Sequence, residues 1–143
     1  MSRILEGKLK GIQHIGIPVT DINVSVQFYQ KLGFNCVMQA SFPLNGTKGE
    51  AKMMKRDDII IELYQMPEPE LNEIKSRKDG HIDHIAFDVE DIDLVYKQLS
   101  QGGFEIIEDS PVFLRFWIDG CRYFNVLGPD KERLEFNEVI HVK

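Results

Sequence analysis

The stretch HIGIPVTDINVSVQFYQKLGF (residues 14–34) recurs without a gap as HIAFDVEDIDLVYKQLSQGGF (residues 84–104), at a shift of 70 residues. Seven of the 21 aligned positions are identical, where average residue usage would give roughly one or two. A second match follows downstream, where IELYQ (61–65) aligns with LEFNE (134–138) at a shift of 73 residues. The chain is therefore interpreted as two copies of one module of about seventy residues.

Each copy opens with a strict alternation of apolar and other residues, over residues 14–19 and 84–89. This period of two predicts a strand with one apolar face. His14 and His84 lie at equivalent positions on the opposite face from the aliphatic side chains. A histidine in such a run is usually a hydrogen-bonded structural residue, but its recurrence in both copies favours a shared function.

A helix is predicted after each of these strands. Thr20 or Asp21 in the first copy, and Glu90 or Asp91 in the second, supply the oxygen acceptor expected at a helix N-cap. Apolar residues then follow at helical spacing. In the first copy the stripe is Ile22, Val26 and Tyr29, with Phe28 and Leu32 beside it. Glycines are expected to end the helices, at Gly33, Gly102 and Gly103.

Three strand-like runs follow each helix, so that each module reads as βαβββ. They span residues 34–42, 50–57 and 59–65 in the first copy, and residues 104–109, 113–126 (bent near Asp119 and Gly120) and 132–139 in the second. Turns are predicted at Gly46, Gly49, Asp57–Asp58 and GPDKE (128–132). One domain over 1–143 is expected, with modules 11–65 and 81–139 and a linker at 66–80 carrying one helical turn.

Size and charge restrict the function. The 143 residues, 43% of them hydrophobic, suffice for one compact domain, and the net charge of −6 with scattered Lys and Arg disfavours nucleic acid as a partner. No apolar run approaches the ~20 residues that a membrane span requires, and no secretory signal is recognisable, so a cytoplasmic protein without membrane association is expected. Cys36 and Cys121 form no CxxC motif and are read as reduced thiols.

A carboxylate occupies the last strand of each module. Glu62 and Glu135 are flanked by apolar residues whose alternation turns both glutamates to the opposite face. If the first and last strands are neighbours in each sheet, each module presents one histidine and one glutamate to a common surface. His14, Glu62, His84 and Glu135 are therefore the predicted metal ligands. Imidazole nitrogen and carboxylate oxygen suit Zn, Ni or Co, with Mn or Fe as further options, and leave two positions open if the geometry is octahedral.

Several other residues are weaker candidates for a functional role. His81 is read as solvent-facing or capping, and His141 as part of the tail. Phe116, Trp117, Arg122, Tyr123 and Asn125 could line a small-molecule pocket, although each aromatic is more readily explained as an ordinary core or strand residue.

These motifs together resemble the vicinal oxygen chelate superfamily, which includes glyoxalase I. The resemblance rests on residues 14–34, HIAFDV (84–89) and LGPDKERLEFNE (127–138), and covers the chain from about residue 11 to 139. It implies an α+β fold in which two βαβββ modules pair into an open, cupped mixed β-sheet. It also implies a divalent metal held by His14, Glu62, His84 and Glu135, all four of which match the ligand types of bacterial glyoxalase I.

The activity implied by this resemblance is that of a metal-dependent lyase or isomerase of the glyoxalase I (lactoylglutathione lyase) type. In that chemistry a proton moves between adjacent carbons of a small α-hydroxycarbonyl or thiohemiacetal substrate through an enediolate. Glu135 would be the leading base and Glu62 its counterpart. Tyr64 and Gln65 follow Glu62 where glyoxalase I usually has a threonine and a nearby asparagine that helps to hold glutathione. The identity of the thiol in the substrate is therefore left open.

Two other interpretations remain open. The stretch DGHIDHIAFDVEDID (79–93) resembles methylmalonyl-CoA epimerase, although VMQASFPLNG (37–46) offers only Gln39 and Ser41 where the epimerase has a third carboxylate. A non-catalytic ligand-binding protein of the antibiotic-sequestering type is the alternative from another class. Extradiol dioxygenases and fosfomycin-modifying enzymes need only two histidines and one carboxylate, so Glu62 favours proton transfer. A homodimer acting on a small molecule is expected.

Overall fold

The computed structural model describes residues 3–77, 82–127 and 133–143. It divides into two compact units. The N-terminal unit comprises His14–Asp83, and the C-terminal unit comprises Met1–Gln13 together with His84–Lys143. The first strand, β1 (Leu9–Pro18), contributes residues to both. His81 and the predicted turn at 128–132 lie outside the described residues, and the predicted module boundaries stay a prediction.

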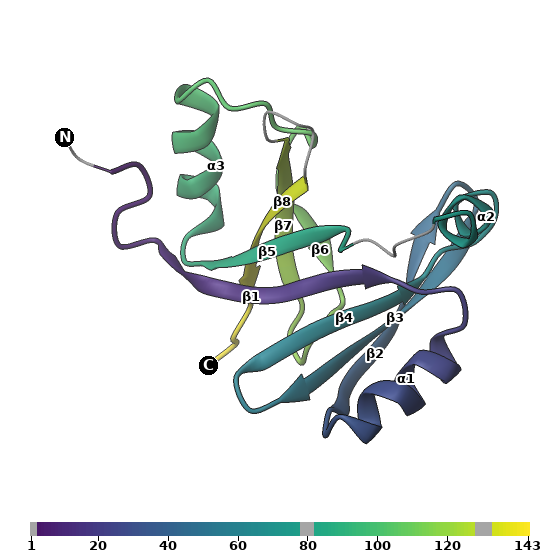
Figure 1. Cartoon of the computed structure of the whole chain (residues 1–143). Helices are drawn as coiled ribbons and strands as arrows, with labels where there is room; N and C mark the ends of the chain where they lie inside the picture. The colour runs from purple at the N-terminus through teal and green to yellow at the C-terminus, as the bar shows by residue number, and fades with distance from the viewer. Residues whose placement is uncertain (1–2, 78–81, 128–132) are drawn as a thin grey trace. The chain divides into compact units, whose positions relative to one another are not determined.

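The N-terminal unit holds the end of β1, the helix α1 (Ile22–Lys31), and the strands β2 (Asn35–Leu44), β3 (Thr47–Arg56) and β4 (Ile59–Gln65), followed by the short helix α2 (Glu70–Lys75). Its strands follow the order β2-β3-β4-β1, with β1 parallel to β4 and the other pairs antiparallel (Figure 1). Helix α1 contacts β2, β3 and β4 and covers the apolar face.

The C-terminal unit repeats this arrangement with β5 (His84–Val89), α3 (Ile92–Gln101), β6 (Val112–Leu114), β7 (Cys121–Leu127) and β8 (Arg133–Val139). The strand order is β5-β8-β7-β6, with β5 parallel to β8 and the other pairs antiparallel. The predicted α+β fold of two βαβββ modules is confirmed. Among the described residues, no helix has the length and apolarity needed to cross a membrane.

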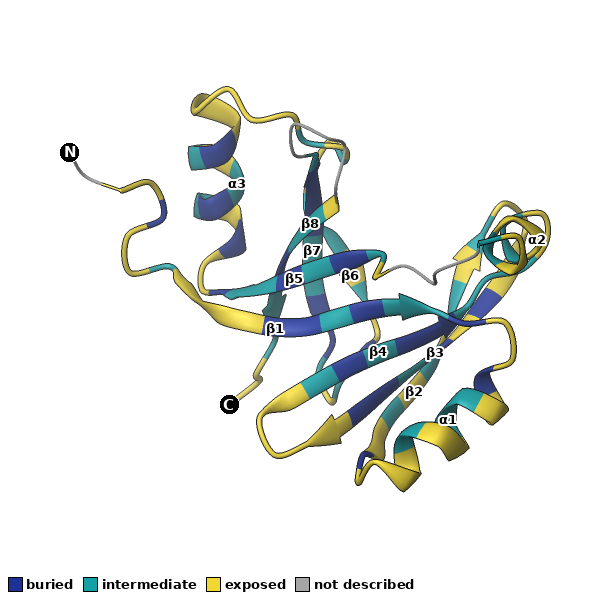
Figure 2. Ribbon diagram, viewed as in Figure 1, coloured by how far each residue is buried: buried dark blue, intermediate teal, exposed yellow. Residues whose placement is uncertain are grey.

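The alternation predicted from the sequence decides which face of each sheet is buried under its helix. In the N-terminal unit, Ile61 and Leu63 of β4 pack with Ile22 of α1 and Val19. In the C-terminal unit the corresponding cluster joins β5, β7 and β8 to α3, whose buried positions alternate with exposed ones in Figure 2. Its members are Leu5, Val89, Ile92, Val95, Leu99, Phe124, Val126 and Phe136. Glu62 and Glu135 therefore lie on the sheet faces opposite the helices.

Both helices begin where the sequence predicts. Asp21 and Asp91 are the N-caps. The Asp21 carboxylate accepts hydrogen bonds from two main-chain N–H groups of the first turn, and that of Asp91 accepts one, from Leu94. The repeat adds a second cap, because the last strand of each module supplies a further acceptor. Ile22 N donates to Gln65 Oε1 at 2.9 Å, and Ile92 N donates to Glu138 Oε1 at 3.1 Å. These contacts fix the end of each closing strand against the start of its helix.

Three local predictions were wrong. Gly49 lies inside β3 rather than in a turn, and the run 113–126 is two strands separated by residues 115–120, in which Trp117 and Gly120 have φ of 65° and 94°. A left-handed residue cannot continue a ladder, so the strand is interrupted. Phe28 and Leu32, which the sequence places beside the stripe of α1, are exposed at 57% and 48%.

The third wrong prediction concerns residues 104–109, which form only a single bridge, Ile106 with Val126. Ile107 N donates to Asn125 O, but the N–H of Asn125 donates to the side chain of Glu108 at 2.6 Å. In a continued antiparallel ladder this N–H would bond the carbonyl of Ile107. The Glu108 carboxylate thus takes the place of a main-chain acceptor and ends the pairing.

Glycine and phenylalanine pair at equivalent places in the two units. Gly49 is the register partner of Phe42 across β2 and β3, and a Cβ atom on Gly49 would collide with the Phe42 ring. Gly120, 71 residues later, lies just before β7 and makes the same close contact with the ring of Phe113, whose register partner is Arg122. In both cases the ring lies over the bare glycine backbone. The duplication therefore extends beyond the stretches in which the sequences match.

Candidate metal-binding residues

The two histidines lie in equivalent strands and are both withdrawn from solvent. His14 in β1 is 2% exposed and His84 in β5 is 8% exposed. Each has its alternating aliphatic neighbours directed to the helix side of its own unit. The imidazole rings accordingly belong to the helix-free face of each sheet, as predicted.

The strand register brings a glutamate to each histidine. In the N-terminal unit Glu62 is paired with Gly16, two residues after His14. In the C-terminal unit Glu135 is paired with Ala86, two residues after His84. Since residues two apart in a strand share a face, each glutamate lies on the same face as its histidine and diagonally across one strand.

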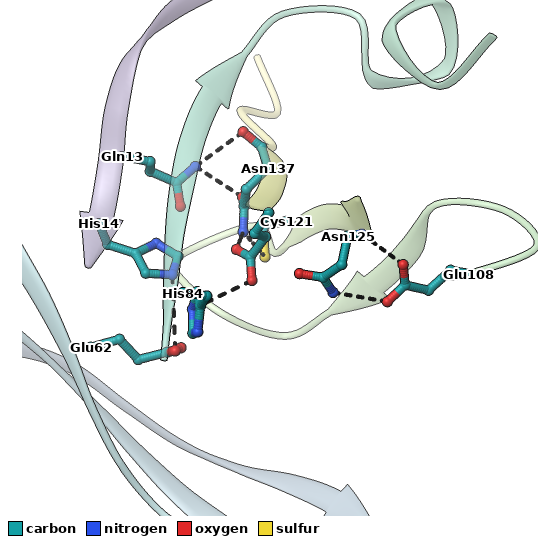
Figure 3. A network of polar contacts seen from close by, with 9 residues as sticks. Gln13, His14, Glu62, His84, Glu108, Cys121, Asn125 and Asn137 are labelled. Carbon is teal, nitrogen blue, oxygen red and sulfur yellow. Dashed lines mark hydrogen bonds and ion pairs between the residues drawn. The ribbon is translucent and has the colours of Figure 1, made fainter. Parts of the chain in front are cut away.

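The side chains meet within each unit. His14 Nε2 lies 3.9 Å from Glu62 Oε1, and His84 Nε2 lies 3.6 Å from Glu135 Oε1, with both glutamate side chains 12% exposed. Figure 3 shows His14 with Glu62. Two ligand atoms about 2.1 Å from one ion are separated by roughly 3.0–4.2 Å. Both separations fall in this range, so each pair fits two ligands of a divalent metal.

Glu135 is held by a buried network that sequence reasoning missed. Asn137, 3% exposed, donates from Nδ2 to Glu135 Oε2 at 2.9 Å. Gln13 Nε2 donates in turn to Asn137 Oδ1 at 2.9 Å and to the main-chain oxygen of Asn137 at 3.1 Å (Figure 3). Asp88 Oδ1 and Cys121 Sγ complete the network. One carboxylate oxygen of Glu135 is thereby oriented by a hydrogen bond while the other lies beside His84.

A second missed contact lies on the neighbouring strand. Asn125 of β7 is the register partner of Glu135, and its N and Nδ2 donate to Glu108 at 2.6 and 2.9 Å. Asn125 was already a candidate pocket residue in the sequence, and Asn137 could have been found because it lies two residues after Glu135 on the same strand face. Glu108 gave no such signal because it lies outside any regular strand.

The two His–Glu pairs differ in the residues that surround their glutamates. The residue that pairs with Glu62 is Met53 of β3, buried and apolar, where the C-terminal unit has Asn125. The residue two positions after the glutamate also differs, being Tyr64 in one unit and Asn137 in the other. The C-terminal half is thus the more polar of the two.

Several other candidates lie away from these residues. Arg122 lies on the helix side of β7 and binds Asp93 of α3 with two hydrogen bonds of 2.8 Å. This hydrogen bond lowers the pKa of the Asp93 carboxyl and raises that of Arg122. Phe116 is a buried residue, and His141 is exposed in the tail. Both cysteines are thiols, Cys36 exposed and Cys121 buried.

The chain is similar in sequence to a curated protein. The chain is 30% identical over 133 residues to the uncharacterized protein YwbC of Bacillus subtilis (strain 168), with 89% of this chain and 96% of that protein covered.

Two solved structures share the fold. One is methylmalonyl-CoA epimerase from Mycobacterium tuberculosis (TM-score 0.76, 17% identity, covering 99% of this chain and 93% of that one). The other is a variant of methylmalonyl-CoA epimerase from Streptomyces coelicolor in complex with 2-nitronate-propionyl-CoA (TM-score 0.74, 20% identity, covering 93% and 99%). At sequence identities this low, the similarity shows a shared fold and does not by itself show a shared activity.

The family model for the Glyoxalase/Bleomycin resistance protein/Dioxygenase superfamily matches residues 11–136. With a match over most of its length, two βαβββ modules and a His–Glu pair in each, the chain belongs to this superfamily.

Proposed function

We propose that this protein is a metal-dependent lyase or isomerase of the glyoxalase I type, which moves a proton between adjacent carbons of a small α-hydroxycarbonyl or thiohemiacetal substrate. His14, Glu62, His84 and Glu135 would together hold one divalent ion. The observation that carries the proposal is the His–Glu pair found at equivalent positions in each module, with separations of 3.9 and 3.6 Å.

The donor set supports a metal of the Ni, Co or Zn kind. Two imidazole nitrogens and two carboxylates are borderline to hard ligands, and such buried carboxylates would be costly without a compensating charge. When bound, the ion supplies Lewis acidity, which stabilises negative charge that develops on the substrate oxygens. If both carboxylates are metal ligands, proton transfer is favoured over reactions whose metal sites need only one carboxylate.

Glu135 is the residue best prepared to act as the base. Its carboxylate is held by Asn137, and Asn137 is itself held by Gln13, so the group keeps one orientation. A general base must be positioned within hydrogen-bond reach of the proton it takes, and a fixed carboxylate meets that need. Glu62 has no asparagine at the corresponding place and is assigned to the other side of the substrate.

Hydrogen exchange measured by NMR in deuterated buffer tests the proposal. The nickel-loaded or zinc-loaded protein is expected to exchange the carbon-bound proton of a methylglyoxal–thiol adduct, and Glu135→Gln is expected to lose this exchange while keeping its circular dichroism spectrum. Glu138→Gln, in the same strand, is the matched control and should retain it. Exchange that persists in Glu135→Gln would exclude this residue as the base.

A second candidate is favoured by the fold comparison. The solved methylmalonyl-CoA epimerases cover 93% to 99% of this chain, and epimerisation is also a proton transfer next to a carbonyl. Strand β2 carries Gln39 and Ser41, both exposed, in the region where the epimerase resemblance calls for a third carboxylate. Exchange into methylmalonyl-CoA but not into the methylglyoxal adducts would select this candidate.

A ligand-binding protein without catalysis is the outcome if metal and ligand bind but neither substrate exchanges. Small-molecule binding alone would then describe the protein. The expected homodimer is tested separately by the mass of the protein in solution, for which light scattering is sufficient.

A further inference from the structure

Asn125 is a buried polar residue whose amide oxygen has no hydrogen-bond donor among the described residues. It lies in β7, is 6% exposed, and is the register partner of Glu135. Its strand neighbours Phe124 and Val126 pack in the hydrophobic cluster beneath α3. Because side chains alternate along a strand, Asn125 belongs to the face that carries Glu135.

The orientation of this amide is fixed by its partner. Glu108 accepts hydrogen bonds from both the main-chain N and the side-chain Nδ2 of Asn125, at 2.6 and 2.9 Å. An ionised carboxylate can only accept, so the amide nitrogen must face Glu108 and the oxygen must face the other way. In Figure 3 that oxygen points toward the side on which His84 lies.

No residue in the described part of the chain donates a hydrogen bond to Asn125 Oδ1, although the atom is buried. A buried acceptor without a donor carries the cost of losing water, and such atoms are few in folded proteins. Glu108 meanwhile interrupts a strand ladder to hold the amide in this orientation. The oxygen is therefore kept available for a donor that comes from outside the fold.

We propose that Asn125 Oδ1 accepts a hydrogen bond from a hydroxyl group of the substrate, with Glu108 as the positioning residue, so that the site selects α-hydroxy compounds over analogues without that donor. The inference rests on the proposed function and adds to it the residue that recognises the substrate hydroxyl group. The corresponding residue of the other module is Met53, which offers no such acceptor, so the hydroxyl is recognised on the side of Glu135 alone.

The experiment compares two probes, lactate and 2-methoxypropionate. Both carry a carboxylate and an α-oxygen, but only lactate has a hydroxyl proton to donate. Binding of each to the zinc-loaded protein is measured by titration calorimetry, after the zinc content of each variant has been determined. Wild type should prefer lactate by about tenfold or more, the usual effect of a buried acceptor left without its donor.

Asn125→Leu should abolish this preference while retaining zinc and the folded circular dichroism spectrum, because Glu108 keeps the main-chain N–H of residue 125. If this variant does not fold, Asn125→Ala replaces it with the same expectation. Glu108→Gln should weaken the preference, since a glutamine allows the Asn125 amide to turn over. Met53→Leu is the matched control at the equivalent position and should leave the preference unchanged.

The outcomes separate the two proposals. Absence of zinc binding in wild type overturns the proposed function and this assignment with it. Normal zinc binding with the same lactate preference in wild type and Asn125→Leu overturns the assignment alone. A large fall in zinc affinity in Asn125→Leu also overturns it, since the residue would then be a metal ligand.

Discussion

Replacing Asn137 by alanine should destabilise the protein more than any surface substitution of the same chemistry. Asn137 is 3% exposed, and its amide connects Gln13 to Glu135 through two hydrogen bonds of 2.9 Å. The bond to the carboxylate is worth about 1.5–3 kcal/mol and the bond from Gln13 about 1 kcal/mol. Gln13 keeps the main-chain oxygen of residue 137 and Asp88 as acceptors, which limits its loss.

The sum is a loss of about 3 kcal/mol in the free energy of unfolding, or roughly 6–12 °C in the melting temperature for a chain of this size. Urea unfolding of chelator-treated protein, followed by circular dichroism, measures it without any contribution from bound metal. Asn23→Ala, on the exposed side of α1, is the control and should change stability by less than about 0.5 kcal/mol. If Asn137→Ala cost no more than this control, the network around Glu135 would not be the constraint described above.

Three further substitutions test the fold. Gly49→Ala should cost about 1–3 kcal/mol in urea unfolding, since the new Cβ would meet the Phe42 ring and lie 2.9 Å from the main-chain oxygen of Gln65; a neutral result would refute that packing. Glu138→Ala should lower stability by about 1 kcal/mol in a thermal melt, because the N–H groups of Asp91 and Ile92 lose their acceptor, whereas an unchanged melt would mean that Asp91 caps the helix alone. Asp93→Asn should cost less than about 1 kcal/mol at neutral pH, as the pair with Arg122 is partly exposed. Because Arg122 holds the folded pKa of Asp93 below its unfolded value, this contribution is present above the unfolded pKa and is lost as the pH falls through the folded one. A difference between Asp93→Asn and wild type that persisted in acid would contradict the ion pair.

The sequence predicted those features that depend on local periodicity. The alternation around His14 and His84 predicted two strands with their apolar sides under a helix. The acceptor side chains at residues 20–21 and 90–91 predicted where the helices begin, and Asp21 and Asp91 are the caps. The faces of Glu62 and Glu135 followed from the same alternation. These predictions succeeded because each depends on neighbouring residues and on a repeat that presents the pattern twice.

Contacts between distant segments could not be predicted in this way. Glu108 ends the strand at residues 104–109 by bonding Asn125, a contact that depends on a side chain outside the regular ladder. Gln13 supports Glu135 by binding Asn137, which lies 124 positions away in the sequence. Trp117 adopts φ of 65°, a conformation that its residue type disfavours. No local pattern in the chain indicates any of these.

The central claim, that both His–Glu pairs serve one ion, is tested most directly by zinc content after dialysis, measured for wild type, His14→Ala and His84→Ala. One zinc ion per chain is expected in wild type, and either substitution should remove it or weaken its binding by a hundredfold or so. Two zinc ions per chain, or one ion retained at full affinity when either histidine is replaced, would show that the pairs act separately and would contradict the account.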